Sequence, residues 1–271
     1  MISVLSDMMS YTFIVRAMIV GGLVALCSAL LGVSLVLKRY SMIGDGLSHV
    51  AFAALTIAVA MNVAPLYIST PIVTVAAIIL LRLSENSKIK GDSAIALIST
   101  VSIAIGVVVT ALTKGMNTDV YSYMFGSILA MSESDVYMSI ALSVVVIILF
   151  VFFYNKIFAV TFDESFAKAT GTRADAYNMI IAVLTAITIV VGMRIMGTML
   201  ISSLIIFPAL ISMRNFKTFK SVIICSAIVS VVCFFLGIVL SYLYSIPTGA
   251  SIVLVNTVAL ILSYLIGELR H

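Results

Sequence analysis

Nine long apolar stretches, separated by short polar segments, constrain the fold of this chain more than any other feature of its sequence. A helix needs about 20 consecutive apolar residues to cross the hydrocarbon core of a bilayer. Of the 271 residues, 63% are hydrophobic and only 10% are charged, which exceeds what a soluble core requires. We therefore expect an all-α, polytopic membrane protein, a helical bundle of about nine transmembrane helices in one transmembrane domain over residues 1–271. The expected spans are 12–37, 46–63, 66–83, 94–113, 136–155, 177–193, 197–213, 221–243 and 251–267.

Lysine and arginine are distributed unevenly among the segments that join these spans. Of the 15 Lys and Arg, 12 follow the odd-numbered spans, namely Lys38, Arg39, Arg82, Lys88, Lys90, Lys156, Lys168, Arg173, Arg214, Lys217, Lys220 and Arg270. Basic residues concentrate in cytoplasmic loops of membrane proteins. The pattern predicts an external N-terminus and a cytoplasmic C-terminus.

The predicted outer segments carry acidic residues: Asp7, Asp119, Glu133 and Asp135. These carboxylates either gather cations or a basic partner, or are solvated loop charges. The segment 118–138 is too polar for a span and too apolar for a free loop, so a short helix is expected there that lies at the outer surface or dips into it. Small residues in the first span, such as Gly21, Gly22 and Gly32, are expected to let helices approach closely.

The stretch SMIGDGLSHVAF places Asp45 and His49 at the head of the second span. Residues four apart lie on the same face of a helix, so the two side chains point the same way. An ionised Asp within a membrane is costly and is usually kept for a partner, a proton or an ion. A carboxylate with an imidazole suits Zn²⁺, Mn²⁺ or Fe²⁺. The residues alone leave open a metal site, a structural hydrogen bond between helices and a proton relay.

The largest predicted cytoplasmic loop, VTFDESFAKATGTRADAY, has the signals of a short amphipathic helix at about 161–171. Thr161 and Glu164 have capping-box spacing, and Gly171 stands where a helix C-terminus favours glycine. Phe162 and Phe166 would share its apolar side. The helix either rests on the membrane surface or docks into a groove of a partner protein.

Enzymatic chemistry is not expected of this chain. The sequence contains no G-x-x-x-x-G-K-[ST], H-E-x-x-H or G-x-S-x-G motif and only two histidines. No permanently bound cofactor is expected, and Cys27, Cys225 and Cys233 fall in apolar runs where they pack like other small side chains. Transport would draw its energy from a partner ATPase or from a gradient. In the gradient case Asp45 and His49 would form the proton relay of a secondary transporter.

Five segments in this order resemble the ABC-3 family, the membrane permeases of bacterial ABC importers for zinc, manganese or iron. They are LVLKRYSMIGDGLSHVAF, YMFGSIL, VTFDESFAKATGT, VGMRIMGTMLISSLIIFPALISMR and IPTGASIVLVNTVALILSYL, and the resemblance covers roughly residues 12–267. It implies the type II ABC importer permease fold, similar to the vitamin B12 importer permease without its first helix. Three of these segments look closer to the zinc permeases than to the manganese ones.

The resemblance also implies partners and roles. The permease would work as a homodimer with cytoplasmic ATPase subunits and an extracellular metal-binding protein, in the bacterial cell membrane and without nucleic acid. Asp45 and His49 would contact the transported ion, Zn²⁺ or alternatively Mn²⁺ or Fe²⁺. The segment from Gly197 to Ala209 would line or support the gate. The coupling helix that docks the ATPase would contain Phe162, Glu164, Phe166, Ala167 and Gly171.

Overall fold

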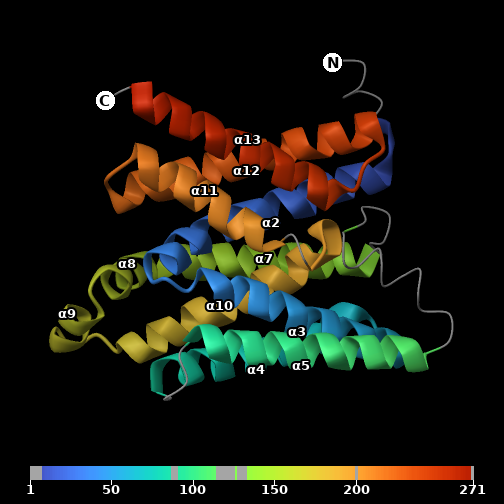
Figure 1. Cartoon of the computed structure of the whole chain (residues 1–271), viewed down its shortest axis with the longest axis horizontal. Helices are drawn as coiled ribbons and strands as arrows, with labels where there is room; N and C mark the ends of the chain where they lie inside the picture. Colours follow the sequence, from blue (N-terminus) through green and yellow to red (C-terminus); the bar gives the residue numbers. More distant parts are fainter. Residues whose placement is uncertain (1–7, 87–90, 114–125, 127–132, 199–200, 270–271) are drawn as a thin grey trace.

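The computed structural model of the chain describes residues 8–86, 91–113, 126, 133–198 and 201–269, and every regular element within these residues is a helix. The helices lie side by side as one bundle (Figure 1). They are α2 (Thr12–Leu37), α3 (Ser41–Ala60), α4 (Pro65–Asn86), α5 (Gly91–Leu112), α7 (Glu133–Phe152), α8 (Tyr154–Phe162), α9 (Glu164–Ala169), α10 (Ala174–Met196), α11 (Ile201–Asn215), α12 (Phe219–Tyr244) and α13 (Thr248–Leu269).

Eight of the described helices are long and apolar enough to cross a membrane: α2, α3, α4, α5, α7, α10, α12 and α13. The ninth predicted span, 197–213, forms as the shorter α11, because α10 continues to Met196 and ends at Gly197, whose φ is +83°. The expected membrane bundle with about nine helices is therefore confirmed. The surface helix expected within 118–138 falls mostly outside the described residues, and α7 begins at Glu133.

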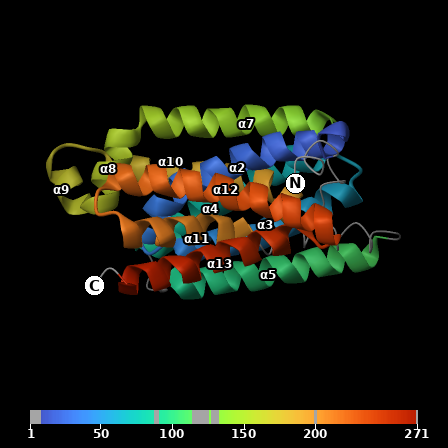
Figure 2. The ribbon, with the colours of Figure 1, turned by 90° about the horizontal axis from the view of Figure 1, so that it is seen from above.

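The helices divide into a central and a peripheral group. In α2 and α3, 72% of the most apolar window is buried, whereas in α5 only 17% is buried. Figure 2 shows α7 on one side of the bundle and α5 with α13 on the opposite side. Apolar side chains on these peripheral helices are exposed, as expected for surfaces that face lipid or another membrane subunit.

Small residues allow the closest helix crossings. A Cβ atom at Gly32 of α2 would lie 2.1 Å from the carbonyl oxygen of Ile205 in α11. A Cβ at Gly21 would overlap the ring of Phe234 in α12, whereas at Gly22 it would meet Phe235 only at 3.6 Å. The close approach expected in the first span is thus required at two of these three glycines.

The two ends of the bundle differ (Figure 1). Helices α8 and α9 project at one end, where α2 and α13 finish and α10 begins; we call this the α9 end. Helix α2 begins and α12 turns into α13 at the other end, the far end. The N-terminus of α2 and the C-terminus of α13 therefore lie at opposite ends of the bundle.

Acidic residues at the far end form ion pairs. The carboxylate of Asp135 lies 2.6 Å from the guanidinium of Arg194, and both side chains are buried. For Asp135 the expectation of a solvated or cation-gathering charge is therefore wrong, because helix packing brings the start of α7 against the end of α10. Glu133 remains exposed and pairs with Arg16. Asp7 and Asp119 lie outside the described residues.

Candidate functional site

Asp45 and His49 lie one turn apart near the start of α3. Oδ2 of Asp45 is 3.6 Å from Nε2 of His49, so helix geometry alone brings the two side chains together. The side chains are 40% and 16% exposed, whereas the opposite face of α3, with Leu47 and Ala51, is fully buried. The pair therefore faces outward from the described part of this single chain.

The glycines on either side of Asp45 define the direction in which the pair points. Gly44 faces Ser202 and Ile205 of α11, and Gly46 faces Ile95 of α5, where a Cβ would come within 2.8 Å. Successive helix residues turn by about 100°, so Asp45 and His49 point between these two directions. The pair thus lies at the seam where α3 packs between α5 and α11.

The pair supplies two donor atoms suitable for a divalent transition metal, one carboxylate oxygen and one imidazole nitrogen. Among the described residues, no group of three or more His, Cys, Asp or Glu side chains is placed to share an ion. The hydroxyls of Ser48 and Thr56 on α3 donate to the backbone carbonyls of Gly44 and Ala53. A tight metal site would need ligands from outside this part of the chain.

The helix expected at about 161–171 forms as the shorter α9. Helix α8 continues to Phe162, so Thr161 lies inside it, and the N-cap of α9 is Asp163, whose Oδ1 accepts a hydrogen bond from the backbone N–H of Phe166 at 2.9 Å. The capping box expected between Thr161 and Glu164 is therefore wrong. Asp163 takes the capping role because a second helix precedes it.

Gly171 ends this segment as expected. Its φ is +82°, the N–H of Gly171 donates to the carbonyl of Lys168, and the N–H of Thr172 donates to that of Ala167. This pair of hydrogen bonds is a Schellman motif, which favours glycine at the left-handed position.

The other residues of the α8–α9 segment differ in exposure. The side chains of Phe162 and Phe166 are 58% and 65% exposed, and Ala167 is buried against α8 and α10. Phe162 also packs edge-on against Phe219 at the start of α12. The segment therefore presents two aromatic rings at the α9 end of the bundle.

Glu164 joins three helices through a polar network. Its Oε2 accepts from Nζ of Lys38 at 3.2 Å and from Nδ2 of Asn178 at 3.0 Å, and Lys38 also donates to Asn178. Its Oε1 pairs with Lys168, which also contacts Asp175 at 2.8 Å. The network ties α9 to the end of α2 and to the second turn of α10.

These contacts shift the titration of Glu164 and Lys168, which lie outside the spanning segments. Partial burial raises the pKa of Glu164, but the hydrogen bonds from Asn178, Lys168 and Lys38 outweigh it and lower the pKa to about 2. The hydrogen bonds to Asp175 and Glu164 raise the pKa of Lys168. Both groups are charged at neutral pH.

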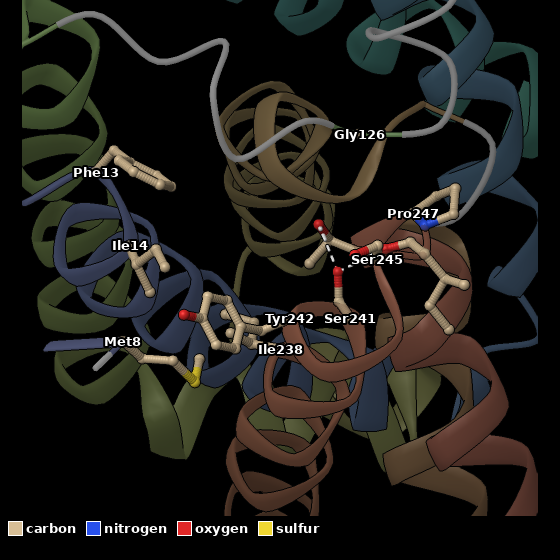
Figure 3. Close-up of a pocket in the computed structure, with 11 residues that line it drawn as sticks. Met8, Phe13, Ile14, Gly126, Ile238, Ser241, Tyr242, Ser245 and Pro247 are labelled. Carbon is tan, nitrogen blue, oxygen red and sulfur yellow. Dashed lines mark hydrogen bonds between the residues drawn. The ribbon is translucent and has the colours of Figure 1, made fainter. Parts of the chain in front are cut away.

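A cavity of about 500 Å³ opens at the far end, between the start of α2 and the turn from α12 to α13. Figure 3 shows Met8 and Phe13 on one side and the α12–α13 turn on the other, where the Ser241 hydroxyl donates to the carbonyl of Ile246 at 2.7 Å. Asp45 and His49 are not among its lining residues, so this cavity is separate from the candidate site.

The model of the ABC 3 transport family matches residues 10–267. The chain belongs to the ABC 3 transport family. It is a membrane protein of this family of ABC transporter permeases, whose members include zinc and manganese permeases.

Relatives in this family carry different metals in their names. The chain is 28% identical to the high-affinity zinc uptake system membrane protein ZnuB of Haemophilus influenzae, over 91% of this chain and 95% of that protein. It is 26% identical to the manganese transport system membrane protein MntC of Halalkalibacterium halodurans, over 95% of this chain and 88% of that protein. Sequence identity to these relatives therefore does not decide whether the transported metal is zinc or manganese.

The fold is similar to that of a solved structure. PsaBC from Streptococcus pneumoniae, solved in complex with a Fab, matches with a TM-score of 0.88 and 26% identity, over 97% of this chain and 95% of that chain. The match supports the expected ABC importer permease fold.

Sequence reasoning missed two residues of the network around Glu164. The charge pattern identifies Lys38 only as a basic residue of a connecting segment, and it assigns no role to Asn178. Asn178 is an amide one turn into a span with only 2% of its surface exposed, and that polar residue in an apolar run was the available signal.

Proposed function

We propose that this chain is the membrane permease of an ABC importer that moves a divalent transition metal into the cytoplasm, with Zn²⁺ as the cargo. The observation that carries the proposal is the Asp45–His49 pair, held on α3 in a chain of a metal-transport family. A carboxylate and an imidazole bind zinc well, and Mn²⁺ and Fe²⁺ are the alternative cargoes.

The proposed site is a transit site rather than a permanent one. Two ligands from one chain bind an ion weakly, which suits a pathway that must release it. In a homodimer whose pathway lies between the two chains, the partner's Asp–His pair would add two ligands. The outward direction of the pair on α3 supports this arrangement.

The α9 end is proposed to lie in the cytoplasm, since it carries most of the basic residues. An ATPase subunit would dock there on α9, the proposed coupling helix. Phe162 and Phe166 would anchor in its groove, Ala167 would hold α9 to the bundle, and Gly171 would fix its end. An extracellular metal-binding protein would deliver the ion at the far end.

The network around Glu164 offers a route from the ATPase to the ion. Lys38 is the C-cap of α2 and begins the short turn into α3, and Asp45 follows only seven residues later. Movement of α9 would act on Lys38 through Glu164 and so shift the start of α3. Closure of the ATPases would thereby change the access to Asp45 and His49.

The test is metal accumulation by mass spectrometry in cells that lack their own high-affinity zinc uptake. The cells would express this chain with its ATPase and binding protein, as wild type, Asp45→Asn or His49→Ala. We expect zinc accumulation that both variants lose. Met42→Leu is the matched control. Met42 is exposed on α3 near the pair, and a leucine at this position keeps the surface apolar, so uptake should be unchanged.

Three outcomes would contradict the proposal. Zinc uptake unchanged in both variants, at normal protein levels, would make the pair structural. Uptake that persists without the ATPase would indicate a gradient-driven transporter with Asp45 and His49 as its proton relay. Accumulation of manganese or iron in place of zinc would contradict zinc as the cargo, while the assignment as an importer permease would stand.

A further inference from the structure

A second cavity, of about 270 Å³, lies at the α9 end where α7 finishes and α10 begins. Lys156 of α8 and Arg173, the N-cap of α10, line it together with Phe153, Tyr177 and the backbone around Gly171. At about 30 Å³ per water molecule, it has room for a phosphate group. It shares no residue with the Asp45–His49 site.

The lining of this cavity is positively charged. Lys156 and Arg173 are exposed, neither forms an ion pair within the described residues, and no carboxylate is among the described residues that line the cavity. The nearby acids Glu164 and Asp175 are bonded instead to Lys168. The two cations therefore keep their charge available for an anion from outside the chain.

The position of the cavity matches the level of lipid headgroups. It lies at the ends of two candidate membrane spans, α7 and α10, which are apolar from this point inward. The rings of Phe153 and Tyr177 meet edge-on at 5.7 Å beside the two cations, and tyrosine is one of the side chains enriched at the membrane–water interface. Ile180, one turn further into α10, adds an apolar side chain to the lining.

We propose that this cavity binds the phosphate group of an anionic phospholipid in the leaflet at the α9 end. Lys156 and Arg173 contact the phosphate, and the acyl chains lie along the exposed apolar surface of α7. Arg173 forms a fork that suits phosphate oxygens, and Lys156 adds a point charge. Basic pockets between membrane helices bind lipid headgroups by this chemistry. The proposal does not depend on the transported metal.

The test compares lipid binding to the full chain in detergent by native mass spectrometry. The probes are phosphatidylglycerol and phosphatidylcholine with identical acyl chains. We expect a preference for phosphatidylglycerol that falls about 25-fold in Lys156→Gln/Arg173→Gln, since each basic residue near anionic lipid contributes about fivefold. Lys217→Gln/Lys220→Gln is the matched control; it removes two exposed cations, one between α11 and α12 and one in the first turn of α12, and should keep the preference.

Further arms separate the alternatives. Lys156→Arg/Arg173→Lys should retain the preference, and all variants should melt like wild type. Equal losses in the glutamine pair and in the control pair would overturn the proposal in favour of diffuse charge attraction. Inorganic phosphate that displaces phosphatidylglycerol at equal concentration would show that the site takes free phosphate. A glutamine pair that keeps the lipid but no longer binds the ATPase would assign the cavity to a protein partner.

Discussion

Lys38, at the end of α2, lies 3.2 Å from Glu164, at the start of α9, although 126 residues separate them in the sequence. The contact is only partly exposed and includes Asn178, so all three side chains meet at one point. Because Lys38 begins the turn into α3, this contact links α9 to the residue from which the chain enters the helix that carries Asp45 and His49.

We expect Lys38→Met to lower zinc uptake by about fivefold or more, the usual lower range of coupling between sites. The variant keeps most of the side-chain volume but removes the contact between α2 and Glu164. Uptake would be measured in proteoliposomes with the ATPase and the binding protein present. Lys220→Met, an exposed lysine of α12, should leave uptake unchanged. Normal uptake by Lys38→Met would show that the contact between Lys38 and Glu164 is not needed for transport.

The low pKa of Glu164 predicts a pH dependence of stability. Its folded-state pKa of about 2 lies below the usual value, so its ionised form stabilises the protein above about pH 4.5, and this contribution is lost as the pH falls towards 2. Wild type should therefore melt at a higher temperature than Glu164→Gln at pH 7, and the difference should shrink below pH 4. Melting curves of the purified chain in detergent would measure it; a difference that grows with acid would contradict the assigned cause.

The buried ion pair between Asp135 and Arg194 should be sensitive to loss of one partner. Arg194→Met leaves the Asp135 carboxylate buried without its guanidinium partner, which typically costs about 3–5 kcal/mol. Asp135→Leu combined with Arg194→Met should recover much of that loss, because no buried charge remains. Denaturation of the single and double variants in detergent gives the comparison, and a double variant no better than the single one would argue against the pairing.

Two glycines of the same helix, α2, provide a matched test of helix packing. Gly32→Ala places a Cβ against the backbone carbonyl of Ile205, which cannot rotate away, so we expect a loss of about 1–3 kcal/mol in stability. At Gly22 the added Cβ meets the ring of Phe235 at an ordinary distance, so Gly22→Ala should be close to neutral. Equal melting temperatures for the two variants would contradict the close crossing of α2 and α11.

The exposed ring of Phe166 should matter to the ATPase and not to the fold. Phe166→Asp is expected to weaken co-purification of the ATPase by about 30-fold, as for an aromatic anchor at an interface. Tyr244→Asp changes an equally exposed ring at the far end and should have no such effect. If both variants retain the ATPase, α9 is not its docking element.

Several features of this protein followed from the sequence by itself. The spans could be predicted because the length of an apolar run and the cost of burying charge in lipid are local properties. The proximity of Asp45 and His49 followed from helix geometry, and the left-handed end of α9 from Gly171, since both depend on a few adjacent residues.

Other features were decided only by the tertiary structure. Glu164 has a plausible local partner in the capping box, but packing of α9 against α2 and α10 gives it Lys38 and Asn178 instead. The sequence indicates that Asp135 is an acidic residue of a loop, whereas in the structure α10 places Arg194 beside it. In both cases the partner is separated by many residues, and which charges meet depends on which helices pack together. Hydropathy and residue spacing along the chain do not show which helices pack together, so they could not predict these ion pairs.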